Sequence, residues 1–180
     1  IDPGKIGVGG IYEKDVNLAI SVKLKKLLEQ SGITVIMTRS DDNGLYNESD
    51  TNKKASDMKK RCSIINESNA DAVVSIHQNS YVSGESRGAQ VFYYKQSAEG
   101  KKLAGIIQRH IVNEADTTNK RVEKADSTYY LLLHTNVPAV IVECGFLSNP
   151  EEAGRLNSDS YQQKIAGSIY NGLMEYLTNQ

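Results

Sequence analysis

The sequence has few of the features that define several classes of protein. It contains no tryptophan, two phenylalanines, three prolines and two cysteines in 180 residues. Two cysteines cannot form the dense disulfide framework of a small secreted scaffold. No apolar stretch approaches the ~20 residues that a membrane-spanning helix needs. Neither sign of charge predominates, since the chain has 21 basic and 22 acidic residues. This balance argues against a nucleic-acid-binding protein, which usually carries a basic surplus.

The order of predicted elements indicates a single α/β domain. The length and the 39% of hydrophobic residues suit one domain with its own core. Apolar residues at helical spacing predict helices at 15–30, 57–68, 98–114 and 161–177, the last capped by Asp159 or Ser160. Short apolar runs predict strands at 33–37, 72–76, 89–94, 128–133 and 139–143, and 40–56 is a polar loop. This alternation predicts a mixed, largely parallel twisted sheet with helices on both faces.

Two polar residues stand at the ends of predicted strands, where parallel sheets carry their sites. His77 follows the strand 72–76, and Glu143 follows four apolar residues at the end of the strand 139–143. A buried carboxylate is costly unless it is paired, protonated or metal-bound, and it suits a general base with a raised pKa. A hydrogen-bonded edge histidine and a loop-holding glutamate are the alternatives that these residues leave open.

The other histidines and the cysteines are interpreted as structural. His110 lies near the apolar stripe of its helix, and His134 lies in the turn before Pro138. Cys62 falls on the apolar face of a helix. Strand alternation places Cys144 on the face opposite Glu143, so no nucleophilic cysteine is expected.

A glycine-rich segment, 4–10, precedes Glu13 and Asp15. Its spacing fits neither the dinucleotide-binding fingerprint nor the P-loop. The two acidic residues alone are typical of a first helical turn. Taken together, Glu13, His77 and Glu143 offer one oxygen ligand, one nitrogen ligand and a base. Catalytic zinc usually has three protein ligands, so this set is one ligand short.

The order and spacing of several motifs resemble the Amidase_3 family, the zinc-dependent N-acetylmuramoyl-L-alanine amidases. The resemblance covers nearly the whole chain. The matching segments are Asp2-Pro3-Gly4, Glu13-Lys14-Asp15, Ser75-Ile76-His77-Gln78-Asn79, Pro138-Ala139-Val140-Ile141-Val142-Glu143 and Gly145-Phe146-Leu147-Ser148-Asn149-Pro150.

The resemblance implies a function and a site. It implies that Glu13 and His77 are ligands of Zn²⁺ and that Glu143 is the catalytic carboxylate. It also implies a third ligand, a histidine in a Gly-His-Gly-Gly segment that follows the first strand of the family. That segment is expected upstream of residue 1, so residues 1–180 are expected to be the amidase catalytic domain without its first strand. On their own they should bind zinc weakly.

Residues 119–126, 129–132 and 142–146 are similar to the CwlD-like branch, which acts on spore cortex. The expected substrate is therefore peptidoglycan, with glycan strands and peptide stems, and the expected location is extracytoplasmic. The resemblance leaves room for an accessory protein that completes or stabilises the metal site, and the oligomeric state stays open. Two alternatives remain: a catalytically incomplete peptidoglycan-binding module of the same fold, and a glycosidase that uses Glu13 and Glu143 as its carboxylate pair.

Overall fold

The computed structural model describes residues 2–179, and within them one four-stranded sheet has the order β1-β4-β2-β3. The strands are β1 Val73–Asn79, β2 Gln90–Tyr94, β3 Lys124–Asp126 and β4 Ala139–Phe146. β4 pairs in parallel with β1 and antiparallel with β2, while β2 and β3 are parallel. The predicted mixed, largely parallel sheet is confirmed.

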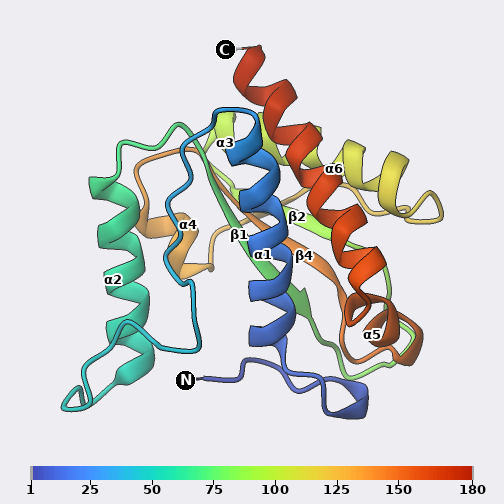
Figure 1. The fold of residues 1–180 in the computed structure, drawn as a ribbon, viewed down its shortest axis with the longest axis horizontal. Coiled ribbons are helices and arrows are strands. Elements are labelled where there is room, and N and C mark those ends of the chain that lie inside the picture. Colours follow the sequence, from blue (N-terminus) through green and yellow to red (C-terminus); the bar gives the residue numbers. More distant parts are fainter. Residues whose placement is uncertain (1, 180) are drawn as a thin grey trace.

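Helices cover both faces of this sheet (Figure 1). On one face, α1 Glu13–Gln30 packs on β1 and α3 Ala98–His110 packs on β2 and β4. α6 Asp159–Thr178 packs against both of these helices. On the other face, α4 Tyr130–His134 lies between α2 Lys53–Glu67 and the strands β2 and β4. A short helix, α5 Pro150–Leu156, follows β4.

The central strand β4 divides the core into two clusters, and all eight of its residues are buried. Val140, Val142 and Cys144 belong to the cluster formed with α1, α3 and α6, whereas Ile141 belongs to the cluster formed with α2 and α4. Side chains alternate along a strand, so Glu143 lies on the same face as Ile141. The confirmed burial of Cys144 on the opposite face follows from the same alternation.

Two predicted strands are wrong. Residues 33–37 run alongside the core without forming a strand: Ile33 and Val35 pack against it, and Ile36 is 56% exposed. The β-branched residues of this segment suit a strand, but among the described residues the sheet ends at β1, so the segment has no hydrogen-bonded ladder. The segment 128–133 contains the start of α4, because Oδ1 of Asp126 accepts hydrogen bonds from the backbone N–H groups of Thr128 and Tyr129 and ends β3.

Several helix boundaries also differ from the prediction. α1 begins two residues earlier, at Glu13, and α2 begins after Asn52, whose side chain accepts a hydrogen bond from the backbone N–H of Ala55. α3 continues into a π-helical turn, Ile111–Ala115. The cap of α6 is Ser158, and neither Asp159 nor Ser160, because its hydroxyl accepts from the backbone N–H of Tyr161.

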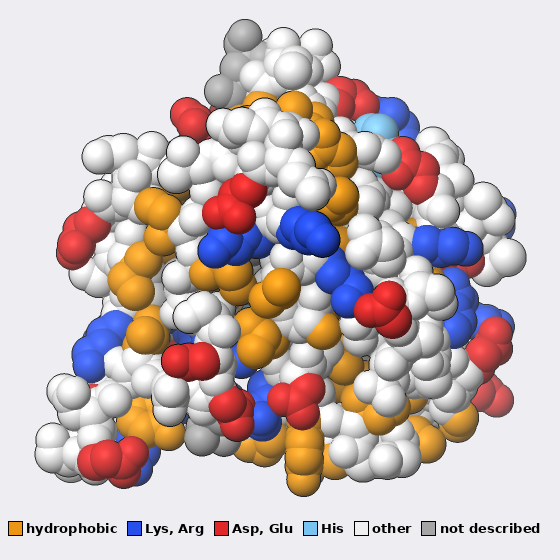
Figure 2. All heavy atoms as spheres, viewed as in Figure 1, with side chains coloured by type: hydrophobic (Ala, Val, Ile, Leu, Met, Phe, Trp, Pro, Cys, Tyr) orange, Lys and Arg blue, Asp and Glu red, His pale blue; other side chains and the backbone are white. Residues whose placement is uncertain are grey.

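The surface over α1 and α6 carries charges of both signs. Figure 2 shows lysine and arginine side chains interspersed with acidic ones on this face, around small apolar areas. Within residues 2–179, no helix is both long enough and apolar enough to cross a membrane.

Candidate active site

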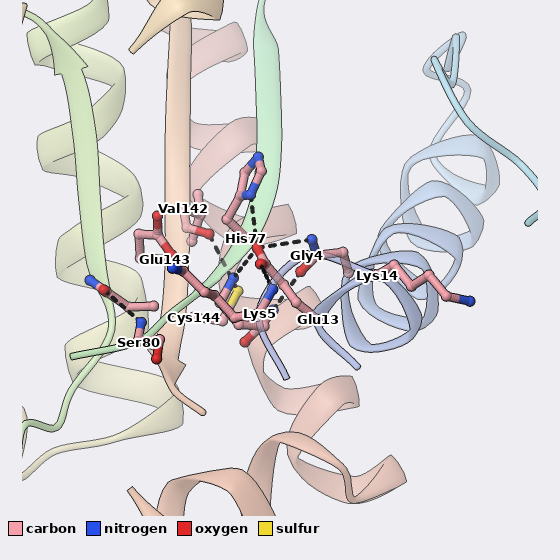
Figure 3. A network of polar contacts seen from close by, with 12 residues as sticks. Gly4, Lys5, Glu13, Lys14, His77, Ser80, Val142, Glu143 and Cys144 are labelled. Atoms are coloured by element: carbon pink, nitrogen blue, oxygen red, sulfur yellow. Dashed lines mark hydrogen bonds and ion pairs between the residues drawn. The ribbon is translucent and has the colours of Figure 1, made fainter. Parts of the chain in front are cut away.

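Glu13, His77 and Glu143 meet at one end of the sheet, although they lie far apart in the sequence. His77 in β1 and Glu143 in β4 are register partners on neighbouring parallel strands. Glu13 is the first residue of α1, and its Oε1 lies 3.0 Å from Nδ1 of His77. Figure 3 shows the two strand residues side by side, with Glu13 approaching from the start of α1. The structure therefore brings together all three predicted site residues.

The N-terminal loop holds the Glu13 carboxylate. The backbone N–H of Lys5 donates to Oε2 at 2.8 Å, and that of Gln78 donates to Oε1 at 3.3 Å. The loop folds back on itself, because the backbone N–H of Glu13 donates to the carbonyl of Lys5. Gly4 has φ +70°, and a Cβ there would lie 2.5 Å from Oε2 of Glu13. The glycine-rich segment thus forms a tight loop around a carboxylate.

Two amide side chains, which the sequence analysis missed, continue this network. Nδ2 of Asn17 donates to Oε1 of Glu13 at 3.4 Å, and Nε2 of Gln78 donates to Oδ1 of Asn17 at 3.1 Å. Gln78 is 2% exposed. The available signals were spacing and adjacency, since Asn17 lies one helical turn after Glu13 and Gln78 follows His77.

Glu13 is an ionised carboxylate at neutral pH. Burial opposes its ionisation, but the hydrogen bonds with His77, Lys5 and Gln78 and the charge of His77 outweigh this effect and lower its pKa to about 2. An ionised, oriented carboxylate beside an imidazole nitrogen is a suitable pair of donors for a cation.

The two oxygens of Glu143 have different surroundings. The hydroxyl of Tyr129 donates to Oε1 at 3.2 Å. Oε2 is buried and has no hydrogen-bond partner among the described residues. Burial raises the pKa of Glu143, and the Glu13 carboxylate adds to this effect, whereas His77 and the Tyr129 hydroxyl oppose it. An unpaired buried carboxylate oxygen is costly for folding and is characteristic of a group that exchanges a proton.

The donor set fits part of a zinc site. Zinc binds histidine nitrogen and glutamate oxygen at ~2.0–2.2 Å, so two ligands of one ion lie within a few ångströms of each other. His77 and Glu13 meet this requirement. Within residues 2–179, no group of three histidine, cysteine, aspartate or glutamate residues is placed to hold a metal ion. Glu13 and His77 therefore form a donor pair that is one short of the three protein ligands usual for catalytic zinc.

The remaining histidines have partners elsewhere. His110 joins α3 to α6, with Nδ1 2.6 Å from Oε1 of Glu114 and Nε2 2.8 Å from Oε2 of Glu175. Nδ1 of His134 lies 2.8 Å from the carbonyl oxygen of Tyr130, and the two rings stack. Both residues are engaged in local structure, as the sequence analysis predicted.

Cys62 and Cys144 are buried, and burial raises the pKa of both thiols. A raised pKa disfavours the thiolate, which is the nucleophilic form.

Comparison with known proteins identifies the family. Residues 1–175 match the Amidase_3 family, described as N-acetylmuramoyl-L-alanine amidase. The germination-specific N-acetylmuramoyl-L-alanine amidase of Bacillus subtilis is 38% identical over 189 residues, covering 100% of this chain and 79% of that protein. The N-acetylmuramoyl-L-alanine amidase LytC of the same species is 31% identical over 177 residues, covering 97% of this chain and 33% of LytC.

A solved structure agrees in both sequence and fold. The CwlD amidase of Clostridioides difficile, determined in complex with the GerS lipoprotein, superposes with a TM-score of 0.97 and is 43% identical, covering 100% of this chain and 94% of that one. The mixed sheet, the motifs and these relatives agree, and the chain belongs to the N-acetylmuramoyl-L-alanine amidase family, with CwlD-like relatives.

Proposed function

We propose that this protein is a zinc-dependent amidase that hydrolyses the bond between N-acetylmuramic acid and L-alanine in peptidoglycan. The observation that carries the proposal is the buried, unpaired Oε2 of Glu143 on the strand next to the Glu13–His77 donor pair. An amide hydrolase needs a base of this kind beside a site that polarises the substrate carbonyl.

The residues have separate roles in this proposal. Glu13 and His77 would hold Zn²⁺ together with the third ligand that the family resemblance implies, a histidine. The ion supplies a Lewis acid that polarises a carbonyl group and acidifies a water molecule. Glu143 accepts the proton of the attacking water at Oε2 and passes it to the departing alanine nitrogen. Its raised pKa supports this role, because a base that must also act as an acid works best with a pKa near the operating pH.

The names of the relatives support a more specific substrate, location and partner for the same activity. One relative is germination-specific, and another was determined in complex with a lipoprotein. We infer that the substrate is spore-cortex peptidoglycan, that the protein acts outside the cytoplasm, and that an accessory protein completes or stabilises its metal site.

Exchange of Glu143 for glutamine tests the proposed chemistry. Glu143→Gln preserves the shape of the side chain but cannot accept the proton, so cleavage by the full-length, zinc-loaded protein should fall by ~10²–10⁴-fold. The zinc content should stay unchanged, because Glu143 is not a ligand in this proposal. Release of free alanine amines from peptidoglycan measures cleavage, normalised to the folded fraction. Glu151→Gln, an exchange of an exposed glutamate, is the control.

The same assay separates the alternatives. Reducing ends released without amines would identify a glycosidase. Release of neither product by the zinc-loaded protein would favour a binding module. Near-normal amine release by Glu143→Gln would remove Glu143 from the mechanism.

A further inference from the structure

The orientation of the Glu143 carboxylate depends on a single hydrogen bond among the described residues. The Tyr129 hydroxyl donates to Oε1 at 3.2 Å, and Oε2 has no partner there. The last torsion of a glutamate side chain has a broad, roughly two-fold preference, so a carboxylate without an anchor has no well-defined plane. A hydrogen bond to one oxygen fixes that plane and makes the two oxygens different.

Tyr129 is itself held by two elements of the fold. Its ring packs edge-on against Phe92 of β2, with centroids 5.5 Å apart and an interplanar angle of 63°, and Phe92 is buried. Its backbone N–H donates to Oδ1 of Asp126 at 2.9 Å, in the turn that begins α4. The position of the hydroxyl is therefore set by the core cluster that the sheet forms with α2 and α4. A rigid donor of this kind loses little conformational freedom when it binds the carboxylate.

We propose that Tyr129 is a positioning residue for Glu143: its hydroxyl anchors Oε1 and so presents Oε2 as the oxygen that accepts the proton. This inference rests on the proposed amidase function. It adds a residue from α4's N-terminal turn to a site otherwise built by α1, β1 and β4.

The adjacent residue provides a matched control. Tyr130 is 38% exposed and stacks on His134, with ring centroids 3.8 Å apart. Tyr129→Phe and Tyr130→Phe each remove one hydroxyl and keep the ring. Hydrogen bonds to charged groups are strong enough for the loss of one to change a rate by about 10- to 100-fold. In the full-length, zinc-loaded protein, kcat should fall by this order in Tyr129→Phe with KM unchanged, and both constants should stay at the wild-type values in Tyr130→Phe.

A double-mutant cycle distinguishes positioning from general loss of structure. If Tyr129 acts through Glu143, Tyr129→Phe should cause no further fall in kcat when it is added to Glu143→Gln. A Tyr129→Phe protein with wild-type kcat, or one that slows the Glu143→Gln protein by the same factor, would overturn the proposal.

A second cycle, measured by urea unfolding, needs no activity and uses Glu143→Leu, because leucine has no acceptor for the Tyr129 hydroxyl. The effects of Tyr129→Phe and Glu143→Leu on the unfolding midpoint should be coupled, and the effects of Tyr130→Phe and Glu143→Leu should be additive. Additive effects of the first pair would overturn the hydrogen bond itself. If the wild-type protein releases no alanine amines, the proposed function fails, and the unfolding cycle still decides whether Tyr129 holds Glu143.

Discussion

Nδ1 of His77 lies 3.0 Å from Oε1 of Glu13, although 64 residues separate the two in the chain. The contact exists because β1 carries His77 to the end of the sheet where α1 begins with Glu13. Backbone N–H groups of Lys5 and Gln78 hold the carboxylate in this position. The pair is therefore a rigid feature of the fold, and its consequences can be tested with metal, with pH and with single substitutions.

Metal content should depend on His77 and not on the other histidines. His77→Gln removes a nitrogen ligand, so the full-length protein should hold much less than one zinc ion per chain after dialysis. His134→Gln and His110→Gln should keep the wild-type content, because His134 contacts the carbonyl oxygen of Tyr130 and His110 contacts the carboxylates of Glu114 and Glu175. Elemental analysis of dialysed protein measures this. Loss of zinc from folded His134→Gln, with zinc kept in His77→Gln, would show that His134 is the ligand.

The stability that Glu13 contributes to the metal-free protein should depend on pH. Its pKa is about 2 in the folded chain, against an ordinary value of 4.5. A lowered pKa stabilises the folded state fully above about pH 4.5, and this contribution disappears as the pH falls towards 2. The shift corresponds to a free energy on the order of 3 kcal/mol.

Urea unfolding of the wild-type and Glu13→Gln proteins between pH 2 and 7 checks this expectation. The difference in their free energies of unfolding should be largest at neutral pH and should shrink across the acidic range. A difference that does not change with pH would show that the Glu13 carboxylate is not held as described.

Gly4 should be needed for metal binding, whereas Gly9 should matter only for stability. Both residues have positive φ, +70° and +76°, so alanine at either position costs about 1–2 kcal/mol of backbone strain. Only the Cβ of Gly4→Ala meets the Glu13 carboxylate, at 2.5 Å, and nothing lies within 4 Å of a Cβ at Gly9. Calorimetric zinc titrations of the full-length proteins should show weaker binding for Gly4→Ala alone. Equal affinities in the two variants would contradict the loop's role.

Glu152 should stabilise the carboxyl end of β4. It is 2% exposed, and its two carboxylate oxygens accept hydrogen bonds from the backbone N–H groups of Gly88 and Phe146, each at 2.8 Å. Glutamine has one acceptor oxygen, so Glu152→Gln leaves one buried N–H unsatisfied and should cost about 1–3 kcal/mol in urea unfolding. The neighbouring Glu151→Gln removes an exposed ion pair with Arg87 and should cost at most about 1 kcal/mol. Similar losses of unfolding free energy in both variants would argue that the Glu152 hydrogen bonds do not stabilise the end of β4.

Local patterns were enough to predict the long helices and three of the strands. In α1, Val16, Ile20 and Leu24 repeat at helical spacing and are all buried, so a local period identified the element. β4 was recognisable as an unbroken apolar run because both of its faces are covered. Glu143 stood out for the same reason, since a carboxylate at the end of such a run needs a special explanation.

Local patterns did not identify which segments find a strand partner elsewhere in the chain. Residues 33–37 have strand composition, yet a strand also needs a hydrogen-bonded neighbour, which no local pattern specifies. Residues 128–133 contain β-branched and aromatic side chains, yet the Asp126 carboxylate binds two backbone N–H groups there and starts a helix. A local side-chain hydrogen bond outweighed the strand propensity.

The sequence by itself determined which residues are candidates for the chemistry of this protein, because motif order and spacing are properties of the chain. Glu13, His77 and Glu143 were identifiable at that level. Only the tertiary structure decided how they lie relative to one another. The contact of Glu13 with His77, the hydrogen bond of Tyr129 with Glu143 and that of Gln78 with Asn17 are made between side chains that different elements bring within hydrogen-bonding distance. Such contacts depend on the packing of the sheet against its helices, and packing is a property of the folded chain as a whole.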